Sequence, residues 1–131
     1  MNLLYPLAKR FIAGHNFDSA KPKIKELMDQ GYEVSIDYLG ESSSCYEDCL
    51  KARSQYFKII NYYKDQKIDI SIKPSQLGMK LHPLFSYSSL SSLANLAKTF
   101  GHTIRLDMED SSITQMTINQ ALSLNKKFNN V

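Results

Sequence analysis

Several features that define whole classes of protein are scarce in this sequence of 131 residues. Two cysteines are too few for the disulfide framework of a small secreted domain, and they fit a reducing compartment. No apolar run is long enough to span a bilayer, and the N-terminal stretch lacks the charged start and the small-residue cleavage site of a signal peptide. We therefore expect a cytoplasmic protein.

Basic residues are too few and too scattered to indicate a nucleic-acid-binding protein. The formal charge is +3, only three residues are arginines, and basic and aromatic side chains are not interleaved. What is present is an ordinary globular composition, 43% hydrophobic and 22% charged, in a chain long enough for one domain with a modest core. We expect no nucleic-acid partner.

Three short β-branched segments predict strands, and each ends in a charged side chain that a loop follows. They are residues 33–37, 69–73 and 103–107, which end in Asp37, Lys73 and Asp107. In the central segment Ile70 and Ile72 alternate with polar neighbours, which is the period of a strand with one face in a core. A proline directly after Lys73 ends that strand.

Between and after these strands, apolar residues at three- and four-residue steps predict helices. One covers about 44–66, one ends at Gly101, and a last one is capped by a serine at 111–112. Residues 74–87 are predicted to form a long loop, of the kind that is often functional after a strand. The tail, residues 125–131, is predicted to be frayed.

Two helices are expected before the first strand. The first covers about residues 5–13, and the second is capped by Asp18 or Ser19 and ends near Gln30. Pro22 is compatible with this second helix if it lies in the first turn.

The alternation of strand and helix predicts an α/β fold with a parallel sheet and right-handed crossovers. The charged strand ends lie roughly 35 residues apart, the length of one strand-plus-helix unit. Because the carboxyl ends of parallel strands meet at one edge of the sheet, we expect Asp37, Lys73 and Asp107 to face one another there. Three strands do not close a barrel, so the chain forms either a small open sheet or one part of a larger structure.

Three motifs carry a resemblance to a known family. They are Asp-Tyr-Leu-Gly-Glu at 37–41, Ser-Ile-Lys-Pro-Ser-Gln-Leu-Gly at 71–78 and Arg-Leu-Asp-Met-Glu-Asp-Ser at 105–111. Together, and with Lys-Arg-Phe-Ile-Ala-Gly at 9–14, they resemble monofunctional proline dehydrogenase. The resemblance implies a distorted (β/α)₈ TIM-like barrel, of which residues 1–131 are the N-terminal portion: two helices and about three parallel strand–helix units.

The resemblance also implies chemistry. Such a flavoprotein binds FAD, oxidises L-proline to Δ1-pyrroline-5-carboxylate in the first step of proline catabolism, and passes electrons to a quinone, which places it peripherally at the inner membrane. Asp37, Lys73 and Asp107 match family positions that line the proline–flavin pocket, with Lys73 and Asp107 expected to contact FAD. Lys73 could balance charge on the reduced flavin, and the carboxylates could steady the ring nitrogen of proline or accept its proton.

Two family segments have no counterpart here: Arg-x-Val-Lys-Gly-Ala-Tyr, which holds much of the flavin, and Arg-Arg-x-x-Glu, which binds the proline carboxylate. No two arginines of this sequence are adjacent, so it has no guanidinium pair for bidentate carboxylate binding. We therefore expect a truncated or split enzyme that by itself neither binds FAD tightly nor oxidises proline. A complementing chain or self-association would have to complete it.

Two other functions stay open at this point. The chain could be a non-catalytic remnant or an interaction module with an open sheet edge. It could instead be a small metal-assisted α/β enzyme, in which Asp107, Glu109 and Asp110 bind Mg²⁺, although Glu109 and Asp110 also suit the positive end of the next helix.

The remaining candidate side chains point to structure rather than chemistry. Glu41 could orient its loop, and Tyr56 is interpreted as a packing residue. Cys45 and Cys49 are interpreted as plain thiols because no histidine lies at a metal-site spacing from them. The histidines concerned are His15, His82 and His102.

Overall fold

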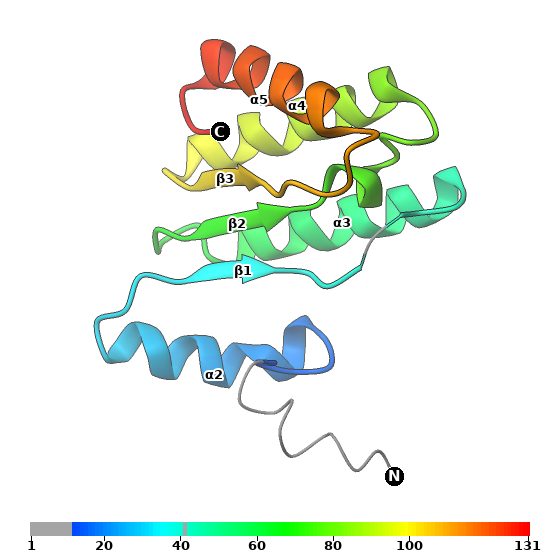
Figure 1. The fold of residues 1–131 in the computed structure, drawn as a ribbon. Coiled ribbons are helices and arrows are strands. Elements are labelled where there is room, and N and C mark those ends of the chain that lie inside the picture. The colour runs from blue at the N-terminus through cyan, green and yellow to red at the C-terminus, as the bar shows by residue number, and fades with distance from the viewer. Residues whose placement is uncertain (1–11, 41) are drawn as a thin grey trace, which may run out of the picture. The chain divides into compact units, whose positions relative to one another are not determined.

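The computed structural model describes residues 12–40 and 42–131 (Figure 1). Internal contacts divide the chain into two compact units. The first unit ends at Val34, and the second runs from Ser35 to Val131. Most of the helix expected over residues 5–13, the first half of the 9–14 motif and the whole of Glu41 lie outside the described residues.

The first unit contains helix α2, Phe17–Asp29. Asn16 caps it through a reciprocal pair of bonds, in which the Asn16 side chain accepts from the Ser19 N–H at 2.9 Å and Ser19 Oγ accepts from the Asn16 N–H at 3.1 Å. The predicted start at Asp18 or Ser19 was therefore wrong, since the capping side chain lies further upstream. As a consequence Pro22 lies inside the helix, beyond the first turn.

The second unit contains a three-stranded parallel sheet in the order β1-β2-β3. Its strands are Ser35–Asp37, Asp69–Ile72 and Thr103–Leu106. Each lies within a predicted segment, and the first begins two residues later than expected. The predicted parallel arrangement is confirmed by the pairing of β1 with β2 and of β2 with β3.

The two faces of this sheet differ completely in polarity. One face carries the isoleucines at positions 36, 70, 72 and 104, all buried. Helices α3, Tyr46–Tyr62, and α4, Pro83–Thr99, bury apolar side chains in the same core, and in Figure 1 both lie behind the strands. The opposite face carries polar side chains, because successive residues of a strand point to opposite sides.

The connection after β2 is more ordered than predicted. A short 3₁₀ helix, η1, covers Pro74–Leu77, and α4 begins at Pro83, so the predicted loop ends earlier than Tyr87. Proline suits the first helical position because its missing N–H needs no partner there. The His82 side chain caps the helix by accepting from the Phe85 N–H at 3.3 Å.

The C-terminal residues are also ordered, so the predicted frayed tail was wrong. Helix α5 covers Thr114–Phe128 and begins after Ile113 rather than at the serines at 111–112. Asn130 then donates from its side-chain amide to the carbonyl oxygens of Ala94 (3.0 Å) and His102 (3.2 Å). Its own carbonyl accepts from the Ile104 N–H at 2.7 Å, which holds the tail against β3.

None of the helices in the described ranges combines the length and the apolar composition needed to cross a membrane.

Candidate active site

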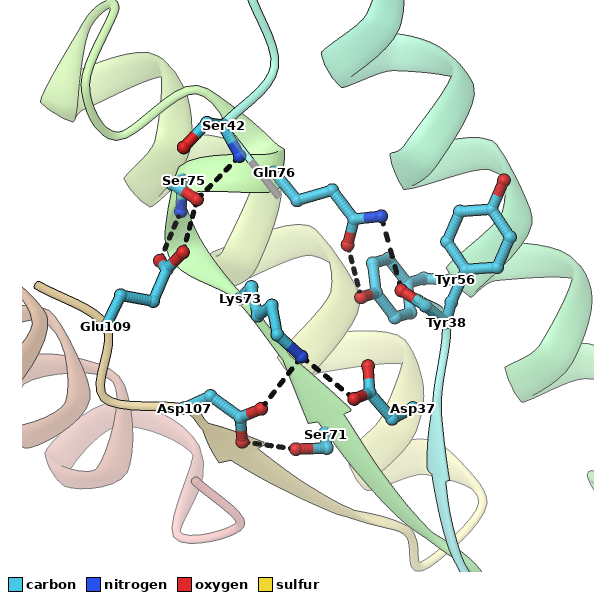
Figure 2. A network of polar contacts seen from close by, with 10 residues as sticks. All are labelled: Asp37, Tyr38, Ser42, Tyr56, Ser71, Lys73, Ser75, Gln76, Asp107 and Glu109. Carbon is cyan, nitrogen blue, oxygen red and sulfur yellow. Dashed lines mark hydrogen bonds and ion pairs between the residues drawn. The ribbon is translucent and has the colours of Figure 1, made fainter. Parts of the chain in front are cut away.

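A lysine and two aspartates meet where the three strands end (Figure 2). Lys73 Nζ lies 2.8 Å from Asp37 Oδ2 and 3.3 Å from Asp107 Oδ2. Their side chains retain 22%, 34% and 27% of their exposure, for Lys73, Asp37 and Asp107 respectively. The group is therefore partly desolvated but open to a ligand, and the prediction that these three residues face one another is confirmed.

The register of the sheet explains why they meet. Asp37 pairs with Ser71 and Ile72 pairs with Leu106, so Lys73 and Asp107 follow the last paired residues of their strands. Residues two positions apart in a strand point to the same face of the sheet. Each of the three charged residues lies two positions after a polar residue of its strand, so all three lie on the polar face. Pro74 then turns the chain into η1, which leaves Lys73 at the tip of β2.

The charges in this group stabilise one another. Partial burial disfavours the ammonium form of Lys73, but hydrogen bonds with Asp37 and Asp107 and their negative charges outweigh it, so the pKa of Lys73 lies above its ordinary value. Asp107 is held at both oxygens, because the Ser71 hydroxyl donates to Oδ1 and Lys73 contacts Oδ2. Lys73 is thus a fixed cation at neutral pH.

A second polar contact connects the core to the loop after β1. Tyr56, fully buried on α3, donates from its hydroxyl to Gln76 Oε1 at 2.7 Å, and Gln76 Nε2 donates to the Tyr38 carbonyl at 3.3 Å. Burial, and then the charges of Asp37 and Asp107, raise the pKa of Tyr56, so its hydroxyl is a proton donor.

Sequence reasoning interpreted Tyr56 as packing and missed this role. The sequence contained one indication of this hydrogen bond, which is that Tyr56 is a tyrosine among aliphatic residues on a buried helix face. A buried hydroxyl needs a hydrogen-bond partner. At Gly40 a Cβ atom would lie 2.5 Å from Gln76 Nε2, so a side chain there would displace the Gln76 amide.

Further down the polar face lies a second charged contact. Arg105 Nη2 lies 3.1 Å from Asp69 Oδ2, and the Ser35 hydroxyl donates to the same oxygen at 2.6 Å. Arg105 belongs to a recognised motif, but only the register reveals that its charge faces Asp69. This arginine is therefore engaged within the sheet, away from the strand tips.

The carboxylates that could have formed a metal site have separate partners. Asp107 contacts Lys73 and Ser71, Glu109 contacts Ser75, and Asp110 contacts Lys80 and Ser112. Within residues 12–40 and 42–131, no three acidic, histidine or cysteine side chains are arranged to hold a metal ion. The geometry therefore does not favour the metal-assisted alternative.

Neither of the two acidic residues that were expected to favour the positive end of the last helix lies in the first turn of α5. Asp110 accepts from the Ser112 N–H at 2.9 Å, next to the helix start, and contacts with Lys80 and Ser112 lower the pKa of Asp110 to about 2. Glu109 instead points to η1, where it accepts from the Ser75 N–H at 2.9 Å. Cys45 and Cys49 are not joined by a disulfide.

Comparison with known proteins gives a consistent result. A sequence model of the proline dehydrogenase family matches residues 20–130. Proline dehydrogenase 2 of Bacillus subtilis strain 168 is 27% identical over 126 residues, which cover 95% of this chain and 42% of that protein. The proline dehydrogenase of Deinococcus radiodurans is 28% identical over 130 residues, with 95% and 42% covered.

One solved structure supports the same fold. The chain superposes with a TM-score of 0.82 and 18% identity on proline utilization A (PutA) from Bdellovibrio bacteriovorus, inactivated by N-propargylglycine; the match covers 93% of this chain and 15% of that one. The predicted α/β fold, a partial TIM-like barrel with three parallel strand–helix units, is thereby confirmed.

The chain spans about two fifths of the length of the curated relatives it matches. Within that span the family match covers residues 20–130, and therefore β1, β2, β3 and the three charged residues at their tips. The chain belongs to the proline dehydrogenase family.

Proposed function

We propose that this chain supplies one wall of a proline dehydrogenase active site, in an enzyme that oxidises L-proline to Δ1-pyrroline-5-carboxylate with FAD and a quinone acceptor. The observation that carries the proposal is the convergence of Lys73 with Asp37 and Asp107 at the carboxyl ends of adjacent parallel strands. This edge is where α/β enzymes place their reacting groups.

The hydrogen-bond donors of Lys73 suit one edge of a flavin ring. An ammonium has three N–H donors, and in the described residues Lys73 directs two of them to Asp37 and Asp107, which leaves one for a ligand. An acceptor atom at the edge of an isoalloxazine ring would suit that donor. Bound FAD would supply the hydride acceptor, while Lys73 and Asp107 would hold and orient one edge of it.

The two carboxylates suit different tasks. Asp107 is fixed by Ser71 and Lys73, so it would act as a stationary charge that keeps Lys73 protonated. Asp37 is the more exposed of the two and contacts Lys73 through Oδ2. We assign Asp37 the task of stabilising the cationic ring nitrogen of proline, or of accepting its proton.

The described residues do not supply the grip on the proline carboxylate. Arg105 is paired with Asp69, Arg53 lies on α3, and the two are far apart in sequence and on different elements. We propose that a second polypeptide segment, either a continuation of this protein or another chain, provides the guanidinium pair and the remaining barrel strands.

The outer edge of β3 is where that segment would join. The Ile104 N–H points away from β2 and donates to the Asn130 carbonyl at 2.7 Å, whereas the Thr103 and Asp107 N–H groups donate toward β2. In a parallel ladder the next outward group is the Leu106 N–H, two residues further along. A parallel strand that continues past Asn130 would pair there. We place the completed enzyme in the cytoplasm, peripheral to the inner membrane.

Co-expression tests this proposal. The chain alone and the chain together with a polypeptide that carries the Arg-x-Val-Lys-Gly-Ala-Tyr and Arg-Arg-x-x-Glu segments are purified, and FAD absorbance and proline-dependent dye reduction are measured. We expect both signals only from the complex. Turnover by the chain alone would contradict the incomplete-site proposal, and a stable complex without flavin or turnover would instead favour a non-catalytic interaction module.

A further inference from the structure

The serine at position 75 connects the loops that follow all three strands. Its Oγ accepts from the Ser42 N–H at 2.9 Å and donates to Glu109 Oε1, and its N–H donates to Glu109 Oε2 at 2.9 Å (Figure 2). Ser42 follows β1, Ser75 lies in η1 after β2, and Glu109 follows β3. We call these three residues the loop tie.

The hydrogen bonds of the loop tie run in one direction. A serine hydroxyl has one proton, and because it is donated to Glu109 the oxygen is available to accept from Ser42. Both oxygens of Glu109 accept hydrogen bonds from Ser75. Ser75 is only 1% exposed, and a charge-assisted bond of this kind is stronger when water is excluded.

The backbone at Ser42 gives an independent sign that the first loop is held in place. Ser42 has a φ of +49°, in the left-handed region that residues other than glycine seldom occupy. Such a conformation persists where the surroundings over-determine it. Two bonds do so here: that from the Ser42 N–H to Ser75, and that from the Ser43 hydroxyl to the Gln76 carbonyl at 2.7 Å.

The loop tie lies immediately beyond the charged group. Ser75 is two residues after Lys73, and Glu109 is two residues after Asp107. The Lys73–Asp107 contact is partly exposed and, at 3.3 Å, longer than the Lys73–Asp37 contact at 2.8 Å. Ser71 holds the other oxygen of Asp107, but it lies on β2 and fixes neither of the two loops, and a partly exposed ion pair adds little to fixing them. The bonds of Glu109 to a buried serine are better suited to that task.

We propose that Glu109 is a positioning residue, which acts through Ser75 to hold Asp107 against Lys73. The inference deepens the proposed function, since it concerns the same charged group. If Glu109 acts in this way, breaking the loop tie should loosen the Lys73–Asp107 contact even though Lys73 and both aspartates are still present.

The test reads Lys73 directly and needs neither FAD nor proline. The chain is produced with ¹³C at the lysine ε-carbons, the Lys73 signal is assigned by its loss in Lys73→Arg, and the pKa of Lys73 is measured by NMR titration. The variants are Ser75→Ala, which breaks the tie without changing any charge, and Glu109→Gln. Asp110→Asn is the matched control, because it removes the same charge from the next residue in the same loop.

We expect Ser75→Ala and Glu109→Gln to lower the pKa of Lys73 by on the order of half a unit, and Asp110→Asn to change it less. Thermal melting identifies any variant that does not fold, and a folded Ser75→Ala decides the question without Glu109→Gln. An unchanged pKa of Lys73 in folded Ser75→Ala, or an equal shift in Asp110→Asn and Glu109→Gln, would overturn the proposal. Either result would leave the co-expression experiment unaffected.

Discussion

The two ends of the parallel sheet are built from different chemistry. At the carboxyl end, Lys73, Asp37 and Asp107 form a charged, partly exposed group. At the amino end, His102 and Asn130 make neutral hydrogen bonds; His102 is 1% exposed, with Nδ1 3.4 Å from the Ile68 N–H and Nε2 3.3 Å from the Ile60 carbonyl. In barrels of this type the first end carries chemistry and the second carries stability. The following predictions test that division.

The largest effect is expected at the carboxyl end. Lys73→Met leaves two carboxylates facing each other without a cation, so we expect the completed enzyme to lose roughly 100-fold in proline-dependent dye reduction. Arg105→Met, lower on the same face, is the matched control and should lose only a few-fold. Equal losses in the two variants would contradict the special position of the strand tips.

The next largest effect is expected at the amino end, in stability. Asn130→Ala removes the side-chain amide that bonds to Ala94 and His102, so we expect the free energy of unfolding in urea to fall by about 1–3 kcal/mol. Asn119→Ala, at an exposed position on α5, should change it by less than ~0.5 kcal/mol. If the two variants are equally stable, the tail does not anchor β3.

His102 predicts how the stability of the amino end depends on pH. Burial lowers the pKa of His102 in the folded chain, outweighing the opposing bond to Ile60, whereas in the unfolded chain the value is about 6.5. Between these two values the unfolded chain binds more protons, so the free energy of unfolding should fall as the pH drops below about 6.5 and should be fully restored above it. Urea titrations at several pH values measure this.

A variant separates the His102 contribution from that of other titrating groups. His102→Gln should flatten the stability profile below about pH 6.5, whereas Asn119→Ala, at an exposed position on α5, should leave its slope as in the wild type. A profile that keeps its slope in His102→Gln would show that other groups cause it.

The smallest effect is expected where the core contacts the carboxyl-end loops. Tyr56→Phe removes the hydroxyl that donates to Gln76, so we expect a loss of about 1 kcal/mol in unfolding free energy. Tyr46→Phe removes a hydroxyl from a residue that is 49% exposed on the same helix, and should have almost no effect. A neutral Tyr56→Phe would mean that this contact adds nothing to the stability of the loop after β1.

Sequence reasoning predicted the strands better than the helix ends. Alternation at Ile70 and Ile72 is a local property of a strand, so β2 could be located within one residue. The starts of α2, α4 and α5 were misplaced, because several side chains near each start could serve as caps. Which of them does so depends on the neighbouring turns: Asn16 rather than Asp18, and His82 well before the predicted start.

The candidate site was predicted in its charged members and missed in its neutral ones. A charged residue at the end of a β-branched segment, such as Lys73, can be recognised from the sequence alone. The partners Ser71, Ser75 and Gln76 belong to the same motif but carry no sign of what they contact. The bonds of these three residues to Asp107, Glu109 and Tyr56 join positions that lie 36, 34 and 20 residues apart, respectively.

The amino-acid sequence by itself determined the order of strands and helices, the polar and apolar faces of each strand, and which residues would end at the sheet edge, because these follow from the period of two along a strand and from local turn residues. Only the tertiary structure decided that Lys73 contacts both aspartates, that Arg105 is paired with Asp69, and that Asn130 holds the edge of β3. Those contacts depend on strand register and helix packing, which bring together residues that no local pattern connects.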